Sequence, residues 1–130
     1  MNRILLYRLV RLGTFLLLPL LLAAACSKTP DQALQAAAEK RDFAKVHRLI
    51  REGANPNVEI SKGMSLLHFA AHQGSVPFAE FLIRHGAEVD LASPRGLTPL
   101  HLAARKGQVE VAKVLIDNGA DVNEEAPSSG

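Results

Sequence analysis

Cysteine is nearly absent from this 130-residue sequence, which contains Cys26 and no other. A single cysteine excludes an internal disulfide framework. A free thiol is a liability in an oxidising compartment, so an exported protein with one cysteine must use it in another way. Cys26 stands at the border between an apolar run and the first polar residues that follow it.

A strong excess of one charge is also missing once residues 1–25 are set apart. The chain has 15 Lys and Arg and 13 Asp and Glu, and three of the arginines but none of the acids precede Cys26. From Cys26 onward, 12 basic and 13 acidic residues remain, which gives a formal charge of −1. Nucleic-acid binding requires a strongly basic face, so we expect no nucleic-acid partner.

No apolar run is long enough for a settled transmembrane helix. The uncharged stretch covers residues 12–25 and is interrupted by Pro19, whereas a membrane-spanning helix needs roughly 20 apolar residues. A basic start, a short apolar stretch and small residues at its end are typical of a secretory signal peptide. We therefore expect residues 1–25 to be a signal peptide, with an uncleaved membrane anchor as the alternative.

The residues that end this stretch, LAAAC at 22–26, resemble the lipobox of bacterial lipoproteins. The resemblance implies that Cys26 is acylated and becomes the new N-terminus, and Ser27 after it implies transfer to the periplasmic face of the outer membrane. Ala23 stands where that family prefers Leu, and the same alanines fit the A-x-A rule of ordinary signal peptidase. Ordinary cleavage would release a soluble periplasmic protein, and anchorage in the inner membrane is a further alternative.

The remainder of the chain repeats itself every 33 residues, which is the signature of a tandem array. Gly53, Gly86 and Gly119 are each followed by alanine. The same spacing relates three further sets of apolar residues: Leu34, Leu67 and Leu100; Leu49, Leu82 and Leu115; and Ile50, Ile83 and Ile116.

Each repeat predicts two short helices. In the last repeat Thr98 is a good N-cap, and Pro99 suits the first helical position because its missing N–H costs nothing there. Gly107 supplies the left-handed conformation that ends a helix. Residues 108–118 then carry an apolar stripe of helical spacing, and Gly119 ends this second helix.

The 33-residue period, together with the segments TPLHLAA at 98–104 and GADVN at 119–123, resembles the ankyrin repeat. The resemblance implies an all-α solenoid of three helix-pair units with projecting hairpin-like loops, at residues 29–60, 61–92 and 93–125. Residues 26–28 would then be a short tether and residues 126–130 a C-terminal tail. The first unit departs from the pattern, with Gln35 in place of the histidine and Arg41 in place of the turn glycine, and suits a polar capping unit. Thr29 and Gln32 predict a capping box at its start.

Two histidines, His68 and His72, lie four residues apart and raise the alternative of a metal site. The zinc-protease pattern H-E-x-x-H fails because Phe69 replaces the glutamate, and no third ligand is evident. His68 and His101 instead hold the histidine position of the T-P-L-H motif, where the imidazole ties its own turn through hydrogen bonds. We therefore predict no metal.

The sequence offers no catalytic constellation. It lacks a Ser/His/Asp order, a G-x-S-x-G elbow and a phosphate-binding glycine loop. Asp90 and Asp121, one in each of two units, are interpreted as loop formers rather than as a carboxylate pair. We therefore expect a protein that is not an enzyme and needs no cofactor.

The ankyrin resemblance implies that a partner binds the concave surface, formed by the loop tips and the exposed side of each first helix. The ionised residues on that surface are basic apart from Glu39, so we expect the partner to be a protein with an acidic surface. The alternative is that these cations only keep the protein soluble. The expected role is a tethered, non-enzymatic module that binds a periplasmic or envelope protein, in an immunity-type or enzyme-assisting capacity. The candidate binding residues are Lys40, Lys62, Met64, His72, Gln73, Arg95, Leu97, Arg105 and Lys106.

Overall fold

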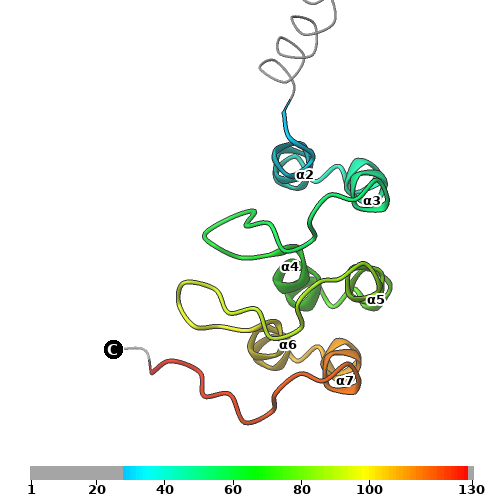
Figure 1. Ribbon diagram of the computed structural model, residues 1–130. Helices are drawn as coiled ribbons and strands as arrows, with labels where there is room; N and C mark the ends of the chain where they lie inside the picture. The colour runs from blue at the N-terminus through cyan, green and yellow to red at the C-terminus, as the bar shows by residue number, and fades with distance from the viewer. Residues whose placement is uncertain (1–27, 129–130) are drawn as a thin grey trace, which may run out of the picture.

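A computed structural model describes residues 28–128 as three helix pairs stacked along one axis (Figure 1). The signal peptide predicted at 1–25, Cys26 and most of the tether lie outside the described residues. Helices α2, α4 and α6 form one column and α3, α5 and α7 the other, while the loops project beyond the first column. The predicted all-α solenoid is confirmed. The helices are α2 Pro30–Glu39, α3 Phe43–Arg51, α4 Leu66–Gln73, α5 Val76–Arg84, α6 Pro99–Lys106 and α7 Val109–Asp117.

The helices begin where the capping residues predict. Thr29 and Gln32 form a complete capping box at the start of α2, with the Thr29 hydroxyl accepting from the Gln32 amide at 3.2 Å. Thr98 caps α6 in the same way, with Pro99 at the first helical position. Each such cap contributes about 1 kcal/mol to helix stability. Gly107 ends α6 with φ 68°, the left-handed conformation expected of it.

The loops are tight turns with little sheet structure. Between residues 28 and 128 the only β-pairing is one isolated bridge, Ser61 to Met64. Lys62 and Gly63, with φ 53° and 72°, form the tip of that turn. The Asp90 carboxylate accepts from the Asp121 amide at 3.0 Å and so joins the last two units, which confirms the interpretation of these acids as loop residues.

Leucine and alanine build the core between the middle and last units. Leu67, Leu82 and Leu115 are fully buried, and Ala70 and Ala103 have no exposed surface. Because alanine is small, α4 packs directly on α6, and α5 packs on α7. Within residues 28–128 no helix is both long enough and apolar enough to cross a membrane.

Aromatic side chains occupy the junction between the first and middle units. Phe43 of α3 stacks on Phe69 of α4 with ring centroids 5.6 Å apart and meets Phe78 of α5 edge-on at 5.7 Å. The residues that follow these phenylalanines by one repeat, at the second junction, are aliphatic. Helices α2 and α4 approach each other less closely than α4 and α6 do. The four phenylalanines of residues 28–128 are Phe43, Phe69, Phe78 and Phe81, and their counterparts at the second junction are Val76, Leu102, Val111 and Val114.

Candidate functional site

The candidate binding residues lie on the loop side of the solenoid and fall into two groups by burial. Lys40 caps the end of α2, and pairs of candidates close α4 and α6, while Lys62 and Arg95 lie in the projecting loops. All of these are exposed. Met64 and Leu97 are half-buried and pack against the core, where the loops return to the helices. The exposed candidates at the ends of α4 and α6 are His72, Gln73, Arg105 and Lys106.

Leu97 also has a structural role through its backbone. Its carbonyl accepts one hydrogen bond from the Ser93 amide at 2.9 Å and another from Nε2 of His68 at 2.8 Å. His68 thereby ties the loop of the last unit to α4 of the middle unit. The sequence predicted that His68 forms hydrogen bonds within its own turn. It did not predict the hydrogen bond from His68 to Leu97 of the next unit.

His68 is a satisfied core residue rather than a metal ligand. Its Nδ1 accepts from the Ser65 amide at 3.2 Å, its Nε2 donates to Leu97, and its side chain has no exposed surface. Burial lowers the pKa of His68, and the bond to the Leu97 carbonyl opposes this only in part. Among residues 28–128 no cluster of three or more His, Cys, Asp and Glu side chains is arranged to hold a metal ion.

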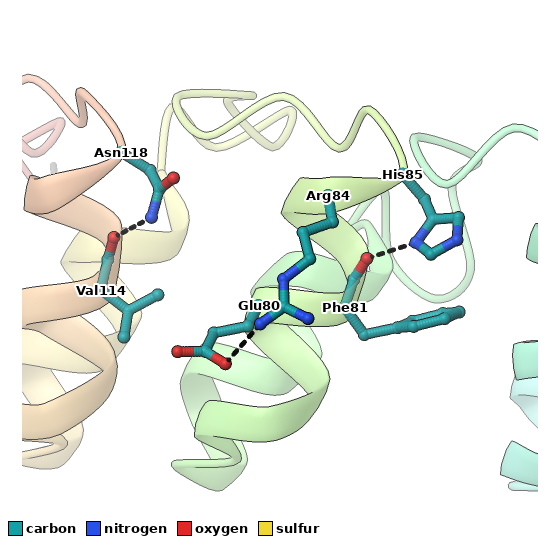
Figure 2. A network of polar contacts seen from close by, with 6 residues as sticks. All are labelled: Glu80, Phe81, Arg84, His85, Val114 and Asn118. Carbon is teal, nitrogen blue, oxygen red and sulfur yellow. Dashed lines mark hydrogen bonds and ion pairs between the residues drawn. The ribbon is translucent and has the colours of Figure 1, made fainter.

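The charges of the two helix columns are organised differently. Each helix of the second column carries one ion pair, between a basic residue and an acid three or four residues away. Figure 2 shows the pair on α5, where Arg84 meets Glu80 at 3.1 Å. The same view shows His85 and Asn118 bonded back to the carbonyls of Phe81 and Val114. The five candidate cations form no ion pair with any residue from 28 to 128. They are Lys40, Lys62, Arg95, Arg105 and Lys106, and we call them the cationic face.

A groove opens at the first junction, between α2 and α4. It consists of two adjoining cavities of about 390 and 400 Å³ that share Arg41, Phe69 and Gln73. The first cavity lies under the hairpin and includes the candidates Met64 and His72. The second extends past Phe43 and Phe78 toward α3. Its size falls within the roughly 300–1,000 Å³ of typical ligand sites. Gln73 is the third candidate that lines the groove, and the other six do not. Arg95, Leu97, Arg105 and Lys106 belong to the last unit, whereas Lys40 and Lys62 are chain neighbours of lining residues.

The groove exists because two residues differ from their counterparts one repeat later. At the second junction a Cβ on Gly74 would clash with the side chain of Gln108, so glycine and glutamine together fill that space. At the first junction the same positions hold Arg41 and Ser75. Arg41 adopts the left-handed conformation with φ 57°, and its side chain lines both cavities. The short serine leaves room for it.

The groove continues into a line of aromatic rings that includes two histidines. The ring of Phe81 lies between His47 and His85, at centroid distances of 4.1 and 4.3 Å. Burial is the main cause of the lowered pKa of His47, and the nearby charges of Arg51 and His85 add to it. A proton on His47 is therefore disfavoured in the folded protein.

Sequence reasoning missed Arg41 and the phenylalanines as site residues. Arg41 was noted only as a departure from the turn glycine, and Phe69 only as the residue that breaks a zinc motif. Two signals were present: a side chain at a glycine position, and four phenylalanines gathered between residues 43 and 81. Neither signal shows that the two features meet in one groove, because Phe69 and Phe78 belong to the repeat after that of Arg41.

Comparison with known protein families matches residues 33–126 to ankyrin repeats, in three copies. The chain belongs to the ankyrin-repeat family. Comparison with curated protein sequences gives no match. Ankyrin-repeat domains are in general non-enzymatic modules that bind other proteins, so the family indicates a protein–protein interaction module.

Proposed function

We propose that this ankyrin-repeat protein binds an acidic protein surface through its cationic face. The observation that carries the proposal is the contrast between the two helix columns. Three of the five Lys and Arg residues on the second-column helices form an ion pair, and Lys45 and Arg51 of α3 do not. All five cations of the cationic face are exposed, and none has an ion-pair partner among residues 28–128. Unpaired charges of one sign attract an oppositely charged partner and raise its association rate.

The proposal includes anchorage in the bacterial envelope through an acylated Cys26, on the periplasmic face of the outer membrane. It rests on the LAAAC segment, since Cys26 lies outside the described residues. Helix α2 begins at Pro30, so three residues separate Cys26 from the array. Such a short tether would hold the first unit against the membrane. A soluble periplasmic protein released by ordinary cleavage is the alternative.

Charge reversal tests the binding face. The triple variant Arg95→Glu, Arg105→Glu, Lys106→Glu is expected to abolish capture of the partner from envelope extracts. We call it the α6 triple variant, because it changes the last two residues of α6 and one residue of the preceding loop. Two of these residues lie in the last turn of α6, where each acid costs about 0.3–1 kcal/mol against the helix dipole. The matched control is Lys45→Glu, Arg48→Glu, Arg51→Glu, which makes the same charge change on α3 and should leave capture intact. Equal capture by the wild type and the α6 triple variant would refute the proposal.

Lipid labelling tests the anchor separately. The wild-type protein should incorporate radioactive palmitate and fractionate with the outer membrane, and Cys26→Ala should do neither. Absence of label on the wild type would leave the soluble alternative, and label in the inner-membrane fraction would correct the location.

A further inference from the structure

We infer that the groove at the first junction binds a bulky apolar side chain, flanked by carboxylates, that projects from the acidic partner. This inference rests on the proposed function, because it specifies the partner's chemistry at one part of the same surface. Its basis is the groove itself, which forms where Arg41 and Ser75 replace the Gly74 and Gln108 pair that is in close contact at the second junction.

The floor of the groove favours an aromatic or long aliphatic side chain. Phe69 reaches both cavities, and the edge of Phe43, whose side chain is 37% exposed, borders the second. Ile60 and Met64 of the hairpin close the first cavity from above. A ring that enters this space leaves water and meets other aromatic rings, which are favourable contacts beyond the area buried.

The rim of the groove favours carboxylates. Arg41 lines both cavities, and Glu39 is the one acid that lines them. Lys40 and Lys62 do not line the cavities but adjoin lining residues in the chain, Lys40 at the end of α2 and Lys62 at the hairpin tip. None of the three cations is paired with an acid among the described residues. A guanidinium binds a carboxylate with two parallel hydrogen bonds, so Arg41 is suited to the residue next to the apolar anchor.

The conformation of Arg41 supports a functional origin of the groove. A residue with a side chain is strained in the left-handed region, and the equivalent positions of the other two units avoid this strain with glycine. Strain of this kind is concentrated at functional sites. Arginine at this position lines both cavities of the groove and supplies its positive charge.

The experiment uses a defined probe, a blocked pentapeptide with a central Phe between two Glu residues. Its binding to the isotope-labelled protein is followed by the shifts of the backbone amide signals. We expect the shifts to gather at residues 38–43, 60–64 and 69–75. Replacing the central Phe by Ala, or the two Glu by Lys, should weaken binding at least tenfold. Shifts elsewhere, or equal binding of the Phe and Ala peptides, would overturn the inference.

The protein's own second junction provides the decisive variant. Arg41→Gly together with Ser75→Gln copies the Gly74 and Gln108 pair, should close the groove without strain, and is expected to weaken binding of the Phe peptide at least tenfold. Arg41→Gly alone should weaken it severalfold and keep the preference for Phe over Ala. Gln108→Ser is the matched control at the second junction and should leave binding unchanged. Binding by the double variant within twofold of the wild type would overturn the inference.

The peptide-binding test of the groove is independent of the partner-capture test of the cationic face. The α6 triple variant changes only residues outside the groove, and it should bind the peptide within threefold of the wild type while losing the protein partner. Loss of partner capture with intact peptide binding supports both proposals. Unaffected capture by the α6 triple variant refutes the cationic face alone, and unaffected peptide binding by the groove variant refutes the groove alone.

Discussion

His68 and His101 make equivalent bonds at equivalent positions of two repeats but differ in burial. Each Nδ1 accepts from the backbone amide of its capping residue, and each Nε2 donates to a carbonyl of the following loop. His68 is fully buried between two units, whereas His101 is partly exposed. The pair therefore separates the contribution of burial from that of the hydrogen bonds.

We predict that His68→Ala lowers the free energy of unfolding by about 3 kcal/mol, because it leaves a cavity and unpaired buried groups. His101→Ala should cost about 1 kcal/mol, because water can replace its bonds. Urea unfolding followed by circular dichroism measures both values. Equal losses would show that burial of His68 contributes little.

The lowered pKa values of His68 and His47 predict a stability that falls in mild acid. An unfolded histidine takes up a proton near pH 6.5, whereas these two remain neutral in the folded protein until a lower pH. The unfolded state therefore binds more protons as pH falls from 7.5 through 6.5, and the free energy of unfolding decreases until the folded pKa values are passed.

Urea midpoints between pH 7.5 and 5 measure this effect. His47→Gln should reduce the pH dependence of the urea midpoint, because it removes one of the two histidines with a lowered pKa. We choose His47 because it is half-buried, so its replacement disturbs the fold less than a change at the buried His68. A pH profile identical to that of the wild type would exclude His47 as a contributor.

At the scale of elements, the helix ends follow from local residues but the packing between units does not. Caps such as Thr29 and Thr98 act within one turn, so the sequence predicted where α2 and α6 begin. The looseness of the first junction depends on which side chains meet across two repeats. Phe43 and Phe69 are 26 residues apart, and no local pattern says that they stack.

We predict unequal protection of the helices in hydrogen exchange. Helices α4 and α5, which are covered on both sides, should exchange slowest. Helices α2 and α3 should exchange faster than α6 and α7, because the helices of the last unit approach those of the middle unit more closely than the helices of the first unit do. Phe43→Ala should raise exchange in α2 and α3 much more than in α6 and α7. Uniform protection across the three units would contradict this order.

At the scale of the whole molecule, the solenoid ends on an apolar surface. Val109 and Ile116 of α7 are 61% and 45% exposed. Their counterparts in the middle unit, Val76 and Ile83, are partly covered by the last unit and pack against the core. The same two residue types thus occupy a partly covered face and an open face of one array.

We predict that Val109→Lys with Ile116→Lys changes the free energy of unfolding by less than about 1 kcal/mol, as expected of exposed positions. Val76→Lys with Ile83→Lys carries the same change of charge and should cost about 3 kcal/mol or more, because it places charges against the core. Thermal unfolding of both variants measures the difference. A large loss in the first variant would show that the open face contributes to stability.

The sequence by itself determined the number of units and the ends of the helices. These follow from a 33-residue period and from caps that act within a few residues, so they can be derived without knowledge of distant contacts. The expectation that the candidate cations lie on the loop side came from the resemblance to the ankyrin repeat. Only the tertiary structure decided that a groove opens at the first junction while Gly74 and Gln108 are in close contact at the second. That difference arises where Arg41 meets the space left by Ser75, and where phenylalanines from two units meet, and such contacts join residues that are far apart in the chain.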